Sequence, residues 1–348
     1  MDLKSMTLDE LKEEMKALSE SAFRAAQIYD WIHVKQVRSV DEMSNLSLSL
    51  RQKLKENYTF TTLVCEREQT SAIDGTKKFL FRLEDGNYVE SVWMQYHHGN
   101  SVCISSQVGC RMGCKFCAST LDGLERNLLP GEMLDQIYMI AHLTKEKVSN
   151  VVVMGTGEPM DNYDNVVKFI RLISDEKGCN LSQRNITVSS CGIVPKLRKL
   201  AEEKLQITLA ISLHAPTDDK RKELMPVANS YSLDELMAVC REYFDKTGRR
   251  ISFEYALVAG QNDREEEAEE LIRLVRGMNC HINLIPVNPI KERKFRPTDR
   301  LRVLGFKNKL EKNGINVTIR REMGRDIDGA CGQLRRKILE EEGQQALK

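Results

Sequence analysis

The chain has 348 residues, with 52 lysine and arginine residues against 51 aspartate and glutamate residues. This length exceeds that of one small domain and allows a large buried core. The near balance of charge excludes attraction to a bulk polyanion through net charge and leaves only a local basic face. No apolar run approaches the roughly 20 residues of a membrane helix, and the first residues lack the apolar stretch of a secretory signal. We therefore expect a cytoplasmic protein with no membrane partner.

Residues 1–60 have the spacing of helices. Thr7-Leu8-Asp9-Glu10 has the form of a capping box, in which the side chains of Thr7 and Glu10 bond each other's backbone amides. Apolar residues then recur at helical spacing, and a second helical pattern covers residues 21–37. We expect a helical accessory domain over residues 1–60, with basic residues on a polar face that water can solvate.

Residues 61–96 change to the alternation of strands. Two strands are expected around a turn at Asp85-Gly86-Asn87, and they form a small β-hairpin connector. The second strand places Glu90 on a mostly apolar face. Glu90 is either a charge at the sheet rim that reaches water, or a carboxylate with a raised pKa that acts as a general base.

Residues 97–348 alternate between strand and helix patterns. Strands are expected at 101–106, 150–155, 184–190, 207–214, 251–258, 282–288 and 315–321. Helices are expected at 131–145, 163–175, 194–204, 231–246, 264–278 and 298–313. This order indicates right-handed βαβ units and a parallel sheet. Because no Rossmann glycine fingerprint is present, the pattern favours an α/β fold built as a full or partial (β/α) barrel.

Polar residues follow the predicted strands, where barrel enzymes carry their chemistry. The residues at these positions are a cysteine loop, Gly155-Thr156-Gly157-Glu158, Ser189-Ser190, Ser212-Leu213-His214 and Asn288. Taken singly they prove little: His214 can be an ordinary rim histidine, and Asn288 before Pro289 can be a turn former. Their collection at one end of the sheet predicts a functional site.

The stretch CISSQVGCRMGCKFC, residues 103–117, contains four cysteines. Cys110, Cys114 and Cys117 form C-x3-C-x2-C, and Cys103 stands seven residues upstream. Structural zinc sites use four ligands, usually as two close pairs, and only one such pair is present. Three thiolates on a [4Fe-4S] cluster leave one iron open to a small chelating molecule. An iron–sulfur cluster is therefore favoured over zinc, and structural disulfides are not expected in a reducing cytosol.

With Phe116 before its last cysteine, this motif resembles the signature of radical S-adenosylmethionine (SAM) enzymes. GTGEP resembles the element of that family whose backbone binds the methionine amino group of SAM. The chain as a whole is similar to the RlmN family, adenosine methyltransferases that act on 23S ribosomal RNA and transfer RNA. The stretches that carry this likeness are QIYDWI, YVESVWMQY, CISSQVGCRMGCKFCAST, GTGEPMDN, ISLHAP, LIPVNP and DIDGACGQL. Thr156 stands where the family pattern GMGEP has methionine. Because the contact to SAM comes from the backbone, this difference should not remove it.

The resemblance implies the site residues. A [4Fe-4S] cluster would be held by Cys110, Cys114 and Cys117. The residues implied for SAM are Gly157, Glu158, Ser189, Ser212, Leu213, His214 and Asn288. Cys331 would carry a methyl group, Cys103 would be its redox partner, and Glu90 would accept a proton. Two SAM molecules would be used per turnover.

The reaction explains why two further thiols are needed. An adenine ring carbon is not a nucleophile, whereas the Cys331 thiolate is and can be methylated by displacement. The family's radical chemistry then joins this carbon unit to the ring, leaving RNA and protein covalently linked. A base removes the ring proton, and Cys103 releases the RNA by forming a transient disulfide with Cys331.

The implied activity is methylation of C2 of adenosine, in the peptidyl transferase centre of 23S rRNA and beside the anticodon of tRNA. A Cfr-like enzyme of the same fold, which methylates C8 of 23S rRNA adenosine and confers antibiotic resistance, is the alternative. A non-enzymatic iron–sulfur or zinc RNA-binding module would not need Cys331 or Glu90. A radical activase would act on a protein instead of RNA.

The expected partners follow from this reaction. The RNA substrates could contact the helices of 1–60 or the basic segment 291–302, which can also be a solvated loop. A low-potential electron donor of the flavodoxin or ferredoxin type is expected. The sequence does not fix the oligomeric state, and a monomer is favoured. The expected domains are 1–60, 61–96 and a catalytic barrel with a C-terminal extension at 97–348.

Overall fold

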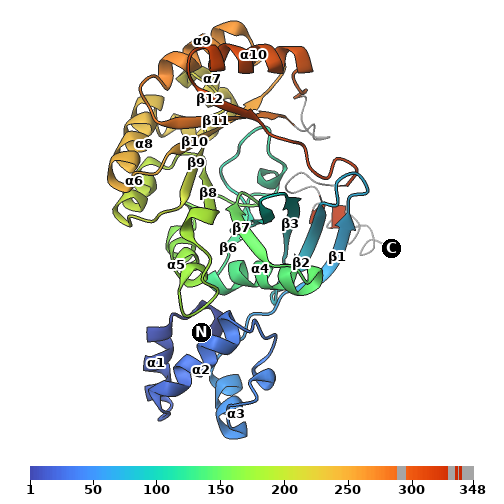
Figure 1. The fold of residues 1–348 in the computed structure, drawn as a ribbon, viewed down its shortest axis with the longest axis vertical. Helices are drawn as coiled ribbons and strands as arrows, with labels where there is room; N and C mark the ends of the chain where they lie inside the picture. The colour runs from blue at the N-terminus through green and yellow to red at the C-terminus, as the bar shows by residue number, and fades with distance from the viewer. Residues whose placement is uncertain (288–294, 328–333, 336, 339–348) are drawn as a thin grey trace.

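The computed structural model describes residues 1–287, 295–327, 334, 335, 337 and 338. Its main feature is a ten-stranded sheet with the order β1-β2-β3-β4-β7-β8-β9-β10-β11-β12, and a separate pair, β5-β6, lies beside it. Figure 1 shows the sheet curving through the molecule, with three N-terminal helices grouped at one end. None of the helices in these described ranges is long and apolar enough to cross a membrane.

The three N-terminal helices begin at polar caps. They are α1 (Leu8–Ala17), α2 (Ala22–His33) and α3 (Leu48–Asn57), with the short 3-10 turns η1 (Leu3–Ser5) and η2 (Val40–Glu42). The predicted capping box of α1 is confirmed: the Glu10 amide donates to Thr7 Oγ1 at 3.2 Å and the Thr7 amide to Glu10 Oε2 at 2.7 Å. The apolar faces of all three helices join the main hydrophobic core.

Three antiparallel strands lead into the parallel sheet. They are β1 (Val64–Thr70), β2 (Lys77–Arg82) and β3 (Tyr88–Tyr96), and β3 pairs antiparallel with β4 (Gly99–Ile104). The expected turn at Asp85-Gly86-Asn87 does join two paired strands. β1 was not predicted, because its sequence VCEREQT has no apolar face. Cross-strand ion pairs with β2, including Glu68–Lys77, hold this polar strand in place.

The rest of the main sheet is parallel. After β4 come β7 (Val148–Val153), β8 (Ile186–Ser190), β9 (Thr208–Ser212), β10 (Ile251–Leu257), β11 (Cys280–Pro286) and β12 (Asn316–Ile319). Each strand pairs with the next in parallel, with no pairing between β1 and β12 in the part of the chain that the structure describes. The predicted partial barrel is therefore confirmed.

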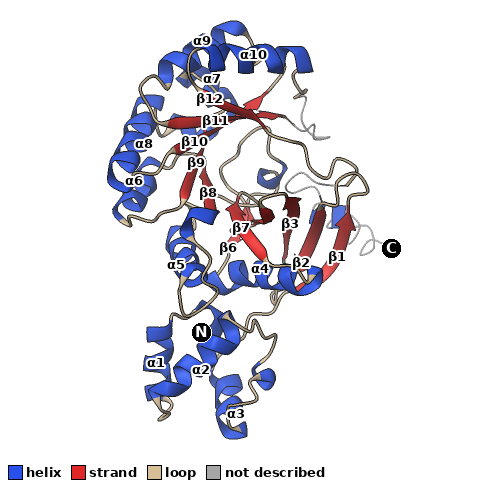
Figure 2. Cartoon of the chain, in the orientation of Figure 1, coloured by secondary structure: helices blue, strands red, loops and turns tan. Residues whose placement is uncertain are grey.

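Helices cross between the parallel strands, as Figure 2 shows. They are α4 (Pro130–Thr144), α5 (Tyr163–Ser174), α6 (Val194–Glu202), α7 (Asp218–Leu224), α8 (Leu233–Thr247), α9 (Glu265–Leu274) and α10 (Arg300–Lys312). The smaller elements are β5 (Gln107–Gly109), β6 (Leu124–Asn127), η3 (Ala118–Thr120), η4 (Gln183–Asn185) and η5 (Pro226–Asn229). The sequence did not predict α7, because DDKRKEL is short and almost entirely charged.

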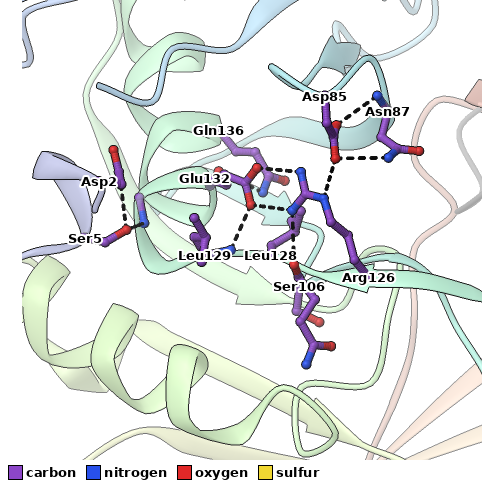
Figure 3. A network of polar contacts seen from close by, with 12 residues as sticks. Asp2, Ser5, Asp85, Asn87, Ser106, Arg126, Leu128, Leu129, Glu132 and Gln136 are labelled. Atoms are coloured by element: carbon purple, nitrogen blue, oxygen red, sulfur yellow. Dashed lines mark hydrogen bonds and ion pairs between the residues drawn. The ribbon is translucent and has the colours of Figure 1, made fainter. Parts of the chain in front are cut away.

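Buried polar contacts fix the N-terminal segment on α4. Lys4 and Asp135 form an ion pair with both side chains almost fully buried, and the other oxygen of Asp135 accepts from the Leu63 amide at 2.7 Å. Figure 3 shows a second contact, in which Ser5 donates to Asp2 and accepts from the Gly131 amide at 2.8 Å. Since a buried charge is costly without its partner, loss of either member of the Lys4–Asp135 pair would loosen this junction.

Arg126 connects the β5–β6 pair to its surroundings. Its guanidinium bonds both oxygens of Glu132 on α4, at 2.7 and 2.8 Å, and also Asp85 in the β2–β3 turn (Figure 3). Burial opposes ionisation of Asp85, but the hydrogen bonds from Arg126 and Asn87 outweigh it and lower the pKa of Asp85 to about 2. This network fixes both strands that flank the cysteine loop.

His33 lies between the N-terminal helices and the barrel. It is fully buried, its Nδ1 lies 3.0 Å from the hydroxyl of Tyr138 on α4, and its ring packs on Tyr29. Burial, together with the charge of Lys4, lowers the pKa of His33 to about 3. The folded protein therefore holds a neutral imidazole here.

The buried, neutral imidazole of His33 predicts that the free energy of unfolding falls as the pH is lowered. A neutral His33 contributes its full stability above the unfolded pKa of about 6.5, and loses it as the pH falls toward 3 because only the unfolded chain takes up the proton. His33→Gln should therefore remove about 2 kcal/mol of the decrease in unfolding free energy between pH 7 and pH 5. Urea unfolding at both pH values measures this, with the exposed His142→Gln as control; equal pH dependence in both variants would contradict it.

Candidate active site

One cavity lies at the C-terminal ends of the parallel strands. Eight residues assigned from the sequence line it: Cys110, Cys114, Cys117, Gly157, Glu158, Ser189, Ser212 and His214. Leu213 does not line it, because its side chain is fully buried and its amide donates to the Glu254 carbonyl at 3.0 Å. Asn288 lies outside the described residues. We call this space the cysteine-loop cavity.

Backbone contacts shape the cysteine loop. It begins at Gly109, whose φ of +76° and close approach to the Gly123 carbonyl leave no room for a side chain. The Cys110 amide donates to that carbonyl at 2.7 Å. Further on, the Thr120 hydroxyl donates to the carbonyls of Cys114 and Cys117, at 3.2 and 3.0 Å. The loop is therefore held in place by contacts to its backbone.

The three thiols suit a cluster bound by thiolates. Cys110 and Cys114 are buried, and Cys114 packs in a cluster with Met112, Phe116 and Met225, while Cys117 is partly buried. Burial raises the pKa of Cys110 to about 12 and that of Cys114 further. Such thiols stay protonated unless a cation compensates the charge of the thiolate, and a metal centre does this.

The spacing of these side chains is also relevant. Nowhere in the described ranges do three His, Cys, Asp or Glu side chains converge as ligands of one metal ion. All three thiols line the cysteine-loop cavity, as a [4Fe-4S] cluster held by three cysteines requires. The residues present therefore fit the cluster that the sequence predicted.

The loop after β7 packs closely against the loop after β4. The carbonyl of Thr156 accepts from the amides of Ser106 and Gln107, at 2.9 and 3.2 Å, and the Gly155 amide donates to Ile104 at 2.9 Å. Gly157 has a φ of +113°, and a Cβ there would lie 2.7 Å from Gln107 Cβ and 2.8 Å from its backbone nitrogen. Only glycine fits this position, and the backbone after β7 is thereby exposed to the cavity.

Glu158 links two strand ends. Its Oε2 accepts from the Cys191 amide after β8 at 2.7 Å, and its Oε1 from the Met160 amide at 3.0 Å. Full burial raises the pKa of Glu158, against the effect of these hydrogen bonds. The carboxylate is thus engaged by the protein. The backbone is engaged too, because the Glu158 amide donates to Gln107 Oε1 at 2.8 Å and its carbonyl accepts from the Asp161 amide at 3.0 Å.

His214 is held in an unusual conformation. Its φ is +57°, in the left-handed region that a non-glycine residue rarely adopts. Nδ1 accepts from the Ala256 amide at 2.9 Å and the carbonyl accepts from Asn262 at 2.7 Å. Burial and the charge of Arg221 lower the pKa of His214 to about 3. A neutral ring with Nδ1 as acceptor carries its proton on Nε2, and its edge contacts Phe116 at a centroid distance of 4.7 Å.

Sequence reasoning missed several residues of this cavity. Cys191 is not among the residues assigned from the sequence, yet it lines the cavity and packs with Cys114. Its place directly after the strand ending at Ser190 was the signal that could have found it. Glu254 also lines the cavity, and burial raises its pKa. It lies within a strand, and the expectation that functional residues follow the strand ends does not point to such a position.

Cys103 lies in a neighbouring cavity, which we call the Cys103 cavity. Its lining includes Val92, Met94 and Tyr96 of β3, together with Arg300, Arg320, Arg321 and Arg325. It shares Ile285, Pro286, Val287 and Arg320 with the cysteine-loop cavity. The two cavities are therefore adjacent. Cys331 lies outside the described residues.

Glu90 is buried, so the alternative of a rim charge that reaches water is wrong. Only 4% of its surface is exposed, and its Oε2 pairs with Lys78 Nζ at 3.0 Å, also fully buried. Its Oε1 accepts from the backbone amide of Arg335 at 2.6 Å. Val92, two residues along the same face of β3, is paired with Cys103. Glu90 and Cys103 thus lie on one face of neighbouring strands.

Comparison with known proteins agrees with this geometry. Residues 104–275 match the Radical SAM superfamily, and residues 1–59 match the ribosomal RNA large subunit methyltransferase N-terminal domain. A solved radical SAM methyltransferase from Sphaerobacter thermophilus superimposes with a TM-score of 0.92, at 43% identity, covering 96% of this chain and 98% of that one.

Closer relatives come from curated proteins. A probable dual-specificity RNA methyltransferase RlmN of Lachnospira eligens is 68% identical over 340 residues, which cover 98% of this chain and 97% of that protein. The protein of the same name from Lachnoclostridium phytofermentans is 61% identical over 340 residues, 98% of this chain and 96% of that protein.

The fold and the cysteine loop define a radical SAM protein, whose cofactors are a [4Fe-4S] cluster and SAM. With relatives of such identity over its whole length, the chain belongs to the RlmN family.

The close approach at Gly157 yields a prediction. Gly157→Ala should strain the loop by about 1–3 kcal/mol, because the added Cβ meets the backbone of Gln107. We expect SAM to bind at least about tenfold more weakly, measured by equilibrium dialysis with cluster-loaded protein. Gly314→Ala is the control, since Gly314 also has a positive φ but has open space around its Cβ position. Equal SAM affinity in the two variants would contradict the role of this contact.

Proposed function

We propose that this protein methylates C2 of adenosine in 23S rRNA and in tRNA, through a methylated Cys331. The observation that carries the proposal is that the cysteine-loop cavity shares a wall with the arginine-lined Cys103 cavity. One cavity suits the cofactors and the other suits a nucleotide. The curated relatives are named as dual-specificity RNA methyltransferases.

The cofactors would be held on the strand ends. Cys110, Cys114 and Cys117 would bind the cluster, and Gly157 and Glu158 would contact SAM. Ser189, Ser212, Leu213, His214 and Asn288 would complete the SAM site. When bound, these groups supply an electron, a methyl group and a radical that abstracts hydrogen.

The Cys103 cavity has the composition of a nucleotide site. Tyr96 and Met94 offer flat, polarizable surfaces for a base. Four arginines in its lining are suited to phosphate groups, which arginine binds through paired hydrogen bonds. A base in this cavity must leave its RNA stack, as in other enzymes that modify a base.

The proposed roles of Cys331 and Cys103 are supported by the chain that follows Cys331. Arg335 donates its amide to Glu90, and Leu334 and Ile338 pack on Leu80 of β2. Four residues span at most about 14 Å, so Cys331 can reach this region of the sheet. Cys103 lies on the same face as Glu90, within reach of a thiol approaching from there.

Glu90 is proposed as the base that removes the ring proton. Its carboxylate lies 3.0 Å from Lys78 Nζ in a buried ion pair, and it is the group that would take the proton. When Glu90 takes the proton, the ion pair loses its attraction. The same carboxylate also accepts from the backbone amide of Arg335, in the segment that follows Cys331.

Further partners complete the proposal. A low-potential donor of the flavodoxin or ferredoxin type would reduce the cluster, and the enzyme would work as a cytosolic monomer. We propose that the helical unit 1–60 contacts RNA, with 61–96 and 97–348 forming the connector and the catalytic barrel. In the basic segment 291–302, residues 291–294 lie outside the described residues.

The position of methylation tests the function. RNA from cells with the gene should carry a C2-methyl on adenosine in 23S rRNA and tRNA, and RNA from cells without it should lack both. Mass spectrometry of nuclease fragments measures this. The high identity to RlmN relatives does not favour the Cfr-like alternative, and methylation of C8 instead of C2 would refute the proposed regiochemistry.

Replacement of Cys331 and replacement of Cys103 should block the reaction at different steps. Cys331→Ala removes the nucleophile, so no carbon unit reaches the RNA and no covalent adduct forms. Cys103→Ala blocks only the release, so the RNA should accumulate as an adduct with the protein. A denaturing gel after incubation with RNA, SAM and reductant measures this. Normal turnover by Cys103→Ala, without an adduct, would refute the role of Cys103.

The same denaturing gel also tests the role of Glu90, with the variant Glu90→Gln. If Glu90 removes the ring proton before release, this variant should also accumulate the adduct, with product formation slowed by about 100-fold or more. Cys65→Ala is the control for loss of a thiol, because Cys65 is only partly buried and lies on β1. Wild-type product formation by Glu90→Gln would leave Glu90 with a structural role only.

A further inference from the structure

Arg221 on α7 is a buried cation, and no described residue offers it a carboxylate partner. Its side chain is fully inaccessible to water, and no ion pair to it exists among the residues that the structure describes. One terminal nitrogen, Nη2, donates to the Cys191 carbonyl at 2.6 Å and more weakly to the Ser212 carbonyl at 3.4 Å. Both carbonyls lie at the ends of strands that border the cysteine-loop cavity.

The other two nitrogens of Arg221 are unsatisfied. Nε and Nη1 are buried and have no hydrogen-bond partner in the described structure. A buried charge with free donors is costly to the protein, and arginine is almost never fully buried unless it is paired. The two contacts to carbonyl oxygens supply dipoles but no opposite charge. The guanidinium therefore calls for an anion, and the described part of the polypeptide does not provide one.

The surroundings of Arg221 point to the cysteine loop. Leu224 and Met225, which follow it directly, pack with Cys114 and Cys191. The Lys115 amide of the cysteine loop donates to the Leu224 carbonyl at 2.9 Å. Burial lowers the pKa of Arg221, and the groups that oppose this most are Cys191 and Cys114, ahead of Asp218. The guanidinium thus lies behind the loop that carries the three ligating thiols.

We propose that Arg221 is a positioning residue whose charge balances the cluster bound by Cys110, Cys114 and Cys117, and thereby favours its reduced state. Three thiolates make the bound cluster anionic, and reduction adds one further negative charge. A fixed cation close by in a medium of low dielectric stabilises the more negative state more strongly. The inference rests on the cluster being present and is independent of the RNA substrate.

A purely structural role would have a different signature. If Arg221 only tied the ends of β8 and β9 together, its hydrogen bonds would matter and its charge would not. Replacement by glutamine keeps a donor for the two carbonyls and removes the charge, whereas replacement by lysine keeps the charge and loses the planar fork. The two substitutions therefore separate charge from hydrogen bonding.

The experiment is a redox titration of the reconstituted protein without RNA or SAM. Dithionite supplies the single electron, and the electron paramagnetic resonance signal of the reduced cluster reports its population. Arg221→Gln and Arg221→Met should lower the equilibrium constant for reduction by about tenfold, which for one electron is a shift of about 59 mV to a more negative potential. Arg221→Lys should stay near the wild-type potential.

Stability of the cluster-free protein gives a second readout. Because the apoprotein leaves this cation without a counter-charge, Arg221→Met should unfold at no lower urea concentration than the wild type. Arg198→Met is the matched control: Arg198 is half exposed and paired with Glu242, so its replacement should leave the potential unchanged.

The outcomes are distinct. Unchanged potentials in Arg221→Gln and Arg221→Met, with normal iron content, would overturn the proposal. The same holds if Arg221→Lys shifts as far as Arg221→Gln. If Arg221→Met does not fold, the comparison of lysine with glutamine still decides. A wild-type protein that binds no iron would instead refute the cofactor assignment on which the proposal rests.

Discussion

The site depends on two backbone segments that lie too close together for any side chain between them. The loop after β7 contacts the loop after β4 through Thr156, Gly155 and Gly157, and the chain that leaves this contact enters the cysteine loop directly. Glu158 extends the arrangement to the next strand by accepting from the Cys191 amide. The cysteines proposed as cluster ligands and the residues proposed to contact SAM are thus fixed relative to each other by hydrogen bonds within the barrel.

The same region concentrates groups whose charge is unusual for a protein interior. A neutral histidine, His214, a cationic Arg221 and protonated thiols share one desolvated site. His214 accepts a hydrogen bond from a backbone amide, and the buried thiols stay neutral. Arg221 has carbonyl dipoles at one terminal nitrogen only, and its charge is the least compensated of the three. A cofactor that carries negative charge changes the balance for all three, which ties the electrostatics of the apoprotein to what it binds.

Much of this could be predicted from the sequence, because strand ends and loop motifs are local. The alternating patterns gave the parallel sheet and its helices, and the motifs gave the cysteine loop and Gly157. Patterns failed where tertiary contacts decide. Arg221 appears in a short, charged stretch typical of a solvated surface, yet it is buried, and Glu90 is paired with a lysine that only strand register brings to it. Burial of a charge has no signature in local sequence.

The missing closure between β1 and β12 has a consequence for aggregation. Within the described ranges, the sheet keeps two edges with unpaired backbone groups, which could recruit a strand from another molecule. β1 presents alternating charged side chains, Glu66, Arg67 and Glu68, along one such edge, and β12 is short, at four residues. Charge and shortness are two of the ways in which natural sheets discourage edge-to-edge association. An open barrel can thus admit a long polymer to its interior from the side, while its sheet edges do not pair with those of other copies of the protein.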